Sequence, residues 1–443
     1  MRHPIRSSAM ASRVFLACSL LVVTATRAAE DAAPVVLQFM FGAGKVPEGC
    51  KQVLPTSVYS PEAGFGFEPK AILESEDNGS TDSLQGRALL GEPSAYFSVA
   101  VPEGNYKVTV VAGDPKSESV LTVKSETRRL MIDHVKVPAG KFGTFSFVAN
   151  VHRPKFAGGS VSLRGTRESV EKAWNWDDKL TLEFSDGHPA VCSLRVEKVD
   201  VPTIFVMGDS TVTDQFKEPW NSWGQMFPRW FKPDIAVANF SESGESLKSV
   251  IAEHRFEKIF SQMRSGDYLL IQFGHNDQKD TAKDAVDVFK KTLGKMVDDA
   301  KTHGGTVVLV TPMERLAGVN TNTLKEYPDA IRAVAGEKQV ALVELHDTTQ
   351  VMYKAMGTEI KKAFQDGTHN NDFGSYETSQ CVVKCIQEVV PELAKHIVDD
   401  FKFDPAHPDS PDSFHVPRST QPTPPASPDS AAPPDSPAPS AKD

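Results

Sequence analysis

Five short apolar runs after Pro202, separated from one another by segments of helical periodicity, constrain the fold of this chain most. The runs are Ile204–Met207, Ile235–Asn239, Tyr268–Phe273, Thr306–Val310 and Val340–Leu345. Between residues 284 and 301 apolar side chains recur every three or four positions, which is the period of an amphipathic helix, and a last helix is expected from about Ser375. Buried runs that alternate with helices are typical of a parallel sheet covered on both faces. We therefore expect an α/β domain over residues 201–403 with five parallel strands.

The region before this domain has the pattern of β structure. Short alternating runs occur at Ala95–Val101, Tyr106–Val111, Phe145–Val151 and Lys179–Phe184. Turn-forming residues separate them, and Pro102-Glu103-Gly104-Asn105 joins two of the runs as a hairpin would. We expect an antiparallel β-sandwich over residues 30–200.

The two ends of the chain differ from both regions. Arginines at positions 2, 6 and 13 precede an apolar run of about ten residues and then small residues near Ala29, which is the pattern of a signal peptide over residues 1–29. A membrane anchor would need about 20 apolar residues. A secreted or periplasmic protein is therefore expected. Residues 404–443 are rich in proline and small polar residues, so we expect a disordered tail that contributes little to stability.

Four cysteines lie beyond the expected signal peptide. In an oxidising compartment Cys50 and Cys192 could pair and tie together the two ends of the β region. Cys381 and Cys385 lie four apart in a helical pattern, a spacing that suits a disulfide poorly, so both are expected in the core.

The charge balance excludes one class of partner. The net charge is −10, and no basic stripe offsets it to bind phosphates, which argues against nucleic acid. The same charge fits poorly with a polyanionic substrate.

A serine follows the first apolar run of the α/β region. Gly208-Asp209-Ser210 comes directly after a buried strand, and the carboxyl ends of parallel strands are where ligands bind. A serine hydroxyl needs a base within hydrogen-bond reach and a third group that orients the base. His369 and Asp366 lie three residues apart just before the last helix, so the carboxylate can reach Nδ1 and leave Nε2 as the proton acceptor. Alone, each motif is also compatible with an ordinary turn.

Two further strand ends offer hydrogen-bond donors. Asn276 follows the run that ends at Phe273, and Gly244 follows the run that ends at Asn239. Donors aimed at a developing oxyanion each contribute on the order of 10²- to 10³-fold in rate. We expect the amides of Ser210 and Gly244 and the side chain of Asn276 to form an oxyanion hole.

A metal site is the alternative for the polar residues of these loops. The candidate ligands are His275, Asp277, His369 and Asp372. No pair has the i, i+4 spacing of a helical histidine motif, and a metal would leave the serine idle. We therefore expect no metal and no cofactor.

Taken in order, these motifs resemble the four blocks of the SGNH (GDSL) hydrolases. They are Gly208-Asp209-Ser210, Gly244, Gly274-His275-Asn276-Asp277 and Asp366-Gly367-Thr368-His369. The resemblance implies a flavodoxin-like three-layer α/β/α fold, a nucleophile at Ser210, an acid and base at Asp366 and His369, and oxyanion donors at Ser210, Gly244 and Asn276.

Within that family the chain looks most like the rhamnogalacturonan acetylesterases. The likeness rests on Gly208-Asp209-Ser210-Thr211-Val212, Trp220-Asn221-Ser222-Trp223-Gly224, Gly266-Asp267-Tyr268 and His369-Asn370-Asn371. The β region, including Gly64-Phe65-Gly66-Phe67-Glu68, resembles the galactose-binding-like sandwich of some bacterial members. One departure is Gly244-Glu245-Ser246, where fungal members often have Gly-Arg-Ser. The missing arginine is a cation that could face a galacturonate carboxylate.

These residues together predict a serine esterase that removes O-acetyl groups from a polysaccharide such as rhamnogalacturonan. Acetylated xylan and a lipid ester are alternative substrates, and a catalytically inactive carbohydrate-binding protein is the alternative from another class. The chain has no long apolar lid segment, which counts against a lipid substrate. Trp220, Trp223 and Trp230 follow the serine at helical spacing, so core packing is expected, with Trp220 the one of the three most suited to the cleft. Arg255 and Arg315 are possible cationic contacts or solvated surface.

Overall fold

The computed structural model describes residues 35–42, 46–69, 73–77, 87–91, 94–165, 168 and 174–420, together with Met1. The expected signal peptide and the end of the expected tail, residues 421–443, lie outside the described residues. The β region and the α/β region belong to one compact unit that begins at Val35.

The α/β region contains the five parallel strands that the apolar runs predict. In chain order they are β15 (Thr203–Gly208), β16 (Ala236–Asn239), β17 (Tyr268–Gln272), β18 (Thr306–Val310) and β19 (Ala341–Val343). Their order in the sheet is β19-β18-β17-β15-β16, and all four pairings are parallel. The order reverses direction beside β15, which is the kind of point where open α/β sheets bind ligands. Ser210 follows this strand.

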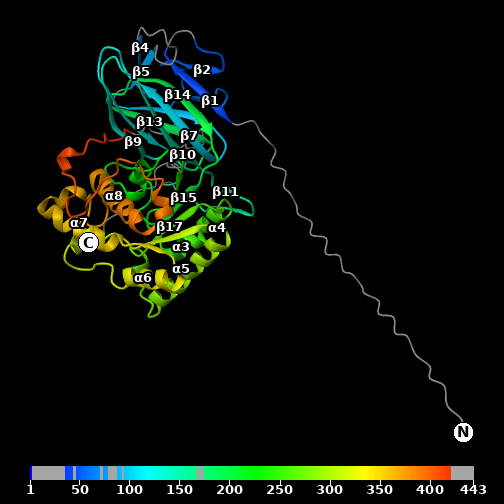
Figure 1. The fold of residues 1–443 in the computed structure, drawn as a ribbon, viewed down its shortest axis with the longest axis vertical. Coiled ribbons are helices and arrows are strands. Elements are labelled where there is room, and N and C mark those ends of the chain that lie inside the picture. Colours follow the sequence, from blue (N-terminus) through cyan, green and yellow to red (C-terminus); the bar gives the residue numbers. More distant parts are fainter. Residues whose placement is uncertain are drawn as a thin grey trace, which may run out of the picture. The chain divides into compact units, whose positions relative to one another are not determined.

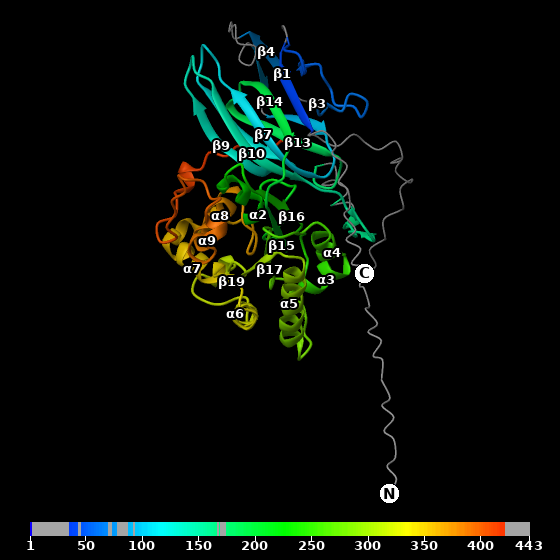
Figure 2. The same ribbon diagram turned by 45° about the vertical axis from the view of Figure 1, so that its right-hand side comes forward.

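Helices cover both faces of this sheet, which gives three layers (Figures 1 and 2). Alternate residues of β15 face opposite sides, so Val206 lies in one core and Phe205 in the other. The first core is closed by α2 (Trp223–Met226), α7 (Leu345–Met356) and α8 (Asp372–Val389). The second is closed by α3 (Leu247–Ala252), α4 (Arg255–Phe260), α5 (Ala285–Thr302) and α6 (Tyr327–Lys338). Short α9 (Pro391–Ala394) follows α8. Within the described ranges, no helix is both long enough and apolar enough to cross a bilayer.

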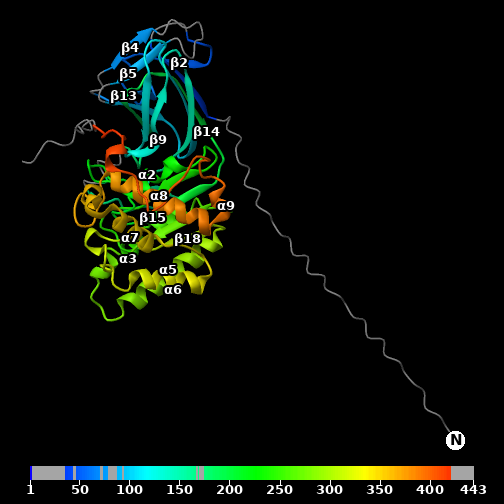
Figure 3. The same cartoon turned by 60° about the vertical axis from the view of Figure 1, so that its left-hand side comes forward.

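The β region consists of two sheets whose inner faces share one core. One sheet has the order β3-β6-β13-β8-β9 and is antiparallel throughout. Its strands are β3 (Phe65–Phe67), β6 (Ser94–Ala100), β8 (Ser119–Ser125), β9 (Arg129–Val137) and β13 (Lys179–His188). The other sheet contains β1 (Val36–Phe41), β2 (Cys50–Val53), β4 (Leu73–Asp77), β5 (Arg87–Gly91), β7 (Gly104–Ala112), β10 (Gly143–Val151) and β14 (Val191–Lys198). Two-residue strands β11 (Lys155–Phe156) and β12 (Gly159–Ser160) pair separately. Figure 3 shows strands of both sheets of this region, among them β9, β13 and β14.

The pairing in the β region differs from the sequence-based expectation at two places. The Pro102 to Asn105 turn does not make a hairpin, because β6 and β7 belong to opposite sheets and the chain crosses between them. The region is also not purely antiparallel, since β1 pairs with β2 in parallel. Turn residues mark where a strand ends but do not specify which sheet the next strand joins.

One strand pair joins the two regions. β10 of the sandwich lies parallel to β16 of the α/β region, with Ala149 opposite Val237. The five-stranded parallel sheet and one sheet of the sandwich therefore form a single mixed sheet of 12 strands.

The expected disordered tail does not begin at 404. Val416 is 8% exposed and packs with Leu130 of β9 and Met226 of α2. The buried Lys124 ammonium donates to Pro417 O at 2.6 Å and to Ser419 Oγ at 2.8 Å. Composition indicated no core here, but a few apolar and polar groups dock residues 404–420 on surfaces that already exist.

The cysteines are not arranged as the sequence suggested. Cys50 is a free thiol whose Sγ lies 3.8 Å from Gln38 Oε1, and the buried Cys192 directs its Sγ to Gly113 O at 3.5 Å. Cys50 and Cys192 therefore do not form the disulfide that the sequence left possible. Cys381 and Cys385 are buried, as predicted.

Candidate active site

Ser210 lies in a tight turn directly after β15. The turn approaches its surroundings closely, because a Cβ on Gly208 would lie 2.5 Å from Val212. Asp209 Oδ1 accepts hydrogen bonds from the backbone N–H and the hydroxyl of Thr211. The Gln215 side chain donates to Ser210 O at 2.7 Å. Ser210 is 9% exposed, so these bonds fix the turn while the serine still reaches the surface.

The structure brings Ser210, His369 and Asp366 together. His369 Nε2 lies 2.8 Å from Ser210 Oγ, and His369 Nδ1 lies 2.8 Å from Asp366 Oδ2. A carboxylate at Nδ1 holds the proton on that nitrogen, so Nε2 is left to accept from the hydroxyl. Burial opposes ionisation of Asp366, but hydrogen bonds from the backbone and ring of His369 and from the Thr368 N–H hold its pKa below the usual value.

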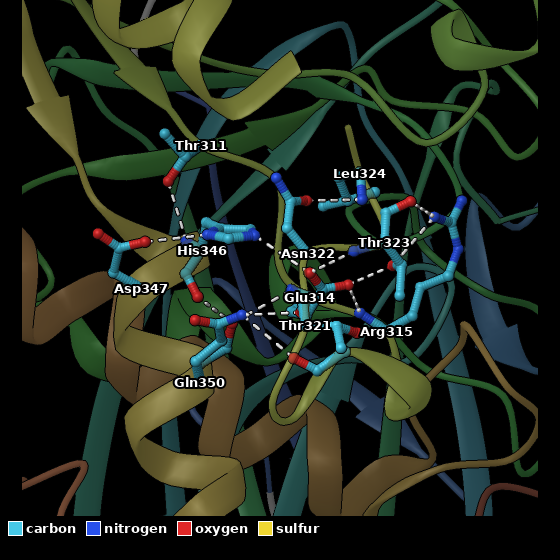
Figure 4. A network of polar contacts seen from close by, with 12 residues as sticks. Thr311, Glu314, Arg315, Thr321, Asn322, Thr323, Leu324, His346, Asp347 and Gln350 are labelled. Atoms are coloured by element: carbon cyan, nitrogen blue, oxygen red, sulfur yellow. Dashed lines mark hydrogen bonds and ion pairs between the residues drawn. The ribbon is translucent and has the colours of Figure 1, made fainter. Parts of the chain in front are cut away.

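Arg315 binds the loop that carries Asp366 and His369. Its Nε donates to Thr368 Oγ1 at 3.2 Å and its Nη2 to His275 O at 3.3 Å. Figure 4 shows Arg315 beside the buried Glu314, which the His346 ring approaches to 3.1 Å. Arg315 is thus neither solvated surface nor an open cationic contact. It holds the base loop against the 274–278 loop.

The expected oxyanion donors are tied to the nucleophile turn by a short series of contacts. The Gln215 side chain that bonds Ser210 O also donates to Ser243 Oγ at 3.2 Å, next to Gly244. Gly244 has φ +80°, a conformation that favours glycine. Asn276 Nδ2 donates to Glu245 O at 2.7 Å. An amide NH₂ carries two hydrogens, so one orients Asn276 and the second can serve a ligand.

The four side chains considered as metal ligands point to different partners. His275 Nδ1 lies 3.2 Å from Asp209 Oδ2, and His369 bonds Ser210. Asp277 accepts from the backbone N–H groups of Leu247 and Gly274, while Asp372 pairs with an arginine of the sandwich. Among the described residues, no group of three or more His, Cys, Asp or Glu side chains has the geometry of a metal site.

A cation that the sequence interpretation missed lies beside Gly244. Arg164, which follows β12, forms ion pairs with Glu245 and Glu253, and its Nη1 lies 3.5 Å from where a Cβ on Gly244 would be. Another part of the chain thus places a cation beside the Gly244-Glu245-Ser246 block, where it is paired with two carboxylates. No local sequence pattern marks Arg164, since its partners lie about 80 residues away. Arg255 is fully buried against Glu168 and is not a surface contact.

Two of the tryptophans after the serine lie in the core as expected, whereas Trp220 does not line the cleft beside Asn276. Trp223 and Trp230 are buried in the core, at 0% and 6% exposure. Trp220 is only partly buried, and Lys217 Nζ lies 5.1 Å from the centre of its ring.

A cleft of about 760 Å³ opens beside Asn276. Its lining combines apolar side chains of α3 and α5 with the polar groups of Ser246, Lys248 and Lys279. A mixed lining of this kind suits a polar, extended ligand.

Comparison with known proteins places this geometry in a family. Residues 206–375 match the model of the GDSL-like Lipase/Acylhydrolase family. Over 217 residues the chain is 35% identical to the rhamnogalacturonan acetylesterase RhgT of Bacillus subtilis, an alignment that covers 44% of this chain and 94% of the relative. The chain belongs to the GDSL-like lipase/acylhydrolase family. It is a carboxylic ester hydrolase, as the family and its esterase relatives indicate.

A second relative extends over more of this GDSL hydrolase. The uncharacterized esterase YxiM of Bacillus subtilis is 25% identical over 366 residues, covering 78% of this chain and 88% of the relative. The crystal structure of YxiM aligns with 80% of this chain and 98% of its own at 22% identity, with a TM-score of 0.42.

Proposed function

We propose that this hydrolase removes O-acetyl groups from an acetylated rhamnogalacturonan, with Ser210 as nucleophile. The observation that carries the proposal is the pair of 2.8 Å contacts that link Ser210 Oγ to His369 Nε2 and His369 Nδ1 to Asp366. The likeness to a protein named as a rhamnogalacturonan acetylesterase supports the choice of substrate.

The reaction proceeds by acyl transfer. Ser210 Oγ attacks the acetyl carbonyl while His369 Nε2 takes the hydroxyl proton. The negative oxygen of the tetrahedral intermediate accepts hydrogen bonds from the amides of Ser210 and Gly244 and from the free hydrogen of Asn276. The intermediate collapses, and the departing sugar oxygen takes the proton from His369. Water, deprotonated by His369, then releases acetate and restores the serine.

The charged groups around the site bear on the choice of polysaccharide. The net charge of −10 disfavours a polyanion in general. Near the site, Lys248 and Lys279 line the 760 Å³ cleft together with Asp277, Asp280 and Asp284. Arg164 beside Gly244 is already paired with Glu245 and Glu253. Local charges act over a Debye length of about 8 Å at physiological salt, so they outweigh distant ones for a bound sugar. Because the charges near the site show no excess of cations, the choice of rhamnogalacturonan rests on the likeness to the relative of that name.

Acetate release from acetylated rhamnogalacturonan, acetylated xylan and a lipid ester tests the proposal. We expect the highest kcat/KM on rhamnogalacturonan, and a loss of at least about 10⁴-fold on Ser210→Ala. A higher kcat/KM on xylan or lipid would refute the substrate and keep the ester chemistry. Normal turnover by a folded Ser210→Ala variant would refute the nucleophile.

We further propose that the protein is exported and that its β-sandwich is galactose-binding-like. The basic and apolar pattern of residues 1–29 supports export. N-terminal sequencing of the protein recovered outside the cytoplasm should begin near position 30, and retention of the leader in a cytoplasmic protein would refute export.

A further inference from the structure

The turn between β8 and β9 of the sandwich inserts into the α/β region next to the active site. Glu126 and Arg128 in this turn have φ of +53° and +63°, a conformation that costs non-glycine residues about 1 kcal/mol or more each. Contacts from the α/β region hold it: Gln225 of α2 donates to Thr127 O at 2.8 Å. The strained turn thus directs Arg128 into the α/β region, while the next residue, Arg129, contacts both Asp214 and, in its own sandwich, Asn150 O.

Arg128 contacts both loops that carry the reacting groups. Its Nη1 donates to Gln215 O and to Trp220 O, each at 2.9 Å, in the segment that follows the nucleophile turn. Its Nη2 pairs with Asp372 Oδ1 at 2.7 Å, three residues after His369. The Nη2 also lies 2.7 Å from Glu218. Arg128 is 3% exposed, so these contacts are shielded from water and are stronger than surface ones.

Two of these partners, Gln215 and Asp372, are connected to Ser210 and to the neighbour of His369. Gln215 donates through its own side chain to Ser210 O. Asp372 also accepts from Asn221 Nδ2 at 2.7 Å, and Asn221 N–H donates to Asn370 O beside His369. A single guanidinium therefore spans the two loops whose separation sets the distance from Ser210 Oγ to His369 Nε2.

We propose that Arg128, supplied by the β-sandwich, is a positioning residue that sets the distance between the nucleophile loop and the base loop. This inference rests on the proposed roles of Ser210 and His369. A misplacement of about 1 Å in a reacting group can cost on the order of 10²-fold in rate. The sandwich is accordingly part of the catalytic unit and not only an appended module.

The geometry requires arginine in particular. The planar guanidinium places two nitrogens toward different partners at once, whereas a lysine ammonium is a single point charge on a flexible stem. Arg128→Lys therefore keeps the buried charge that balances Asp372 and Glu218 but cannot contact both loops. Arg129 acts beside it, with Nε 2.6 Å from Asp214, and would remain in the variant to hold the turn in place.

The test compares Arg128→Lys with the parent on an activated acetate ester, with melting temperature measured on the same preparation. We expect kcat to fall roughly 10- to 100-fold with KM changed by less than about twofold, because a small ester makes few binding contacts and the loss falls on alignment. A folded Arg128→Lys variant with the kcat of the parent overturns the inference. Normal turnover by a folded Ser210→Ala variant would overturn the proposed nucleophile instead, so the two failures can be told apart.

Glu103→Gln is the matched control. Glu103 of the sandwich accepts from the buried Lys258 of α4 at 2.6 Å, so it is also an ion pair between the two regions, but neither partner contacts the Ser210 or His369 loop in any described contact. We expect Glu103→Gln to lower the melting temperature and leave kcat unchanged. An equal loss of kcat in Glu103→Gln would show that any weakened contact between the regions suffices, and would overturn the specific role of Arg128.

Asp372→Asn provides a second variant at the other end of the contact. It should lower kcat in the same direction as Arg128→Lys, and the double variant should fall no further than the worse single variant, since both remove one interaction. Additive losses would overturn the link through Asp372. If Arg128→Lys does not fold, Asp372→Asn alone decides, and a parental kcat in that variant overturns the inference.

Discussion

Replacing Asn276 by alanine separates its proposed role in catalysis from its role in the fold. If one amide hydrogen meets the oxyanion, its loss should lower kcat by roughly 10²- to 10³-fold, or about 2.7 to 4 kcal/mol of transition-state stabilisation, with little change in KM. The other hydrogen bonds Glu245 O at 2.7 Å. Loss of that partly buried hydrogen bond should cost only about 1 kcal/mol of folding free energy.

The catalytic loss should therefore exceed what the change in stability explains. The assay measures kcat, KM and melting temperature on one preparation with an activated acetate ester. Lys279→Ala is the control, because it removes the 2.6 Å contact from Lys279 Nζ to Asn276 Oδ1 and leaves the amide in place, so its kcat should stay within about threefold of the parent. If kcat of Asn276→Ala also stays within about threefold of the parent, Asn276 is not part of the oxyanion hole.

Three further predictions concern the C-terminal segment, pH and metal. Truncation after Phe403 should lower the melting temperature by several degrees, because Val416 no longer packs against Leu130 and Met226 and Lys124 loses its hydrogen bonds to Pro417 and Ser419. A hydrogen bond of a charged group contributes about 1.5 to 3 kcal/mol. Truncation after Thr420 should leave the melting temperature unchanged, and equal melting temperatures for the two truncated proteins would refute docking. Burial and the neighbouring Asp409 carboxylate raise the pKa of Glu377 to about 8, so its contribution to stability is full below about pH 4 and is lost as pH rises to about 8. Glu377→Gln should flatten the fall in melting temperature between pH 5 and 9, and an unchanged slope would contradict this. Prolonged EDTA treatment should leave turnover unchanged, because the serine route needs no metal, and a loss restored by zinc would argue for the metal alternative.

The α/β region could be predicted from the sequence in most of its features. Buried strands of four to six residues and the α5 helix have strong periodicity, and the expected strands match β15 to β19 within a few residues. Ser210, Gly244 and Asn276 follow the carboxyl ends of β15, β16 and β17, so their meeting at one edge follows from the fold class. The pairing of His369 with Asp366 could also be predicted, because the two residues are close in sequence.

The contacts between distant parts of the chain could not be predicted. Arg128 and Arg164 belong to the β region and act on groups about 80 to 250 residues away, and no periodicity or local motif encodes such a contact. The docking of Val416 could not be predicted for the same reason. Composition indicates how much apolar surface a segment carries, but not whether another part of the chain offers a surface for it to pack against. Likewise, turn residues after β6 gave no indication of the sheet that β7 joins.

The pairing of β10 with β16 also covers the edge of the parallel sheet. An edge strand offers a row of unpaired N–H and C=O groups to any other chain, and natural proteins cover or interrupt such rows. β16 is the outer strand of the parallel sheet, and the sandwich covers it through the pair at Ala149 and Val237. A fragment that began at Val201 would expose that row along a strand of four buried residues, so it should precipitate or form oligomers at concentrations where the full chain stays dispersed.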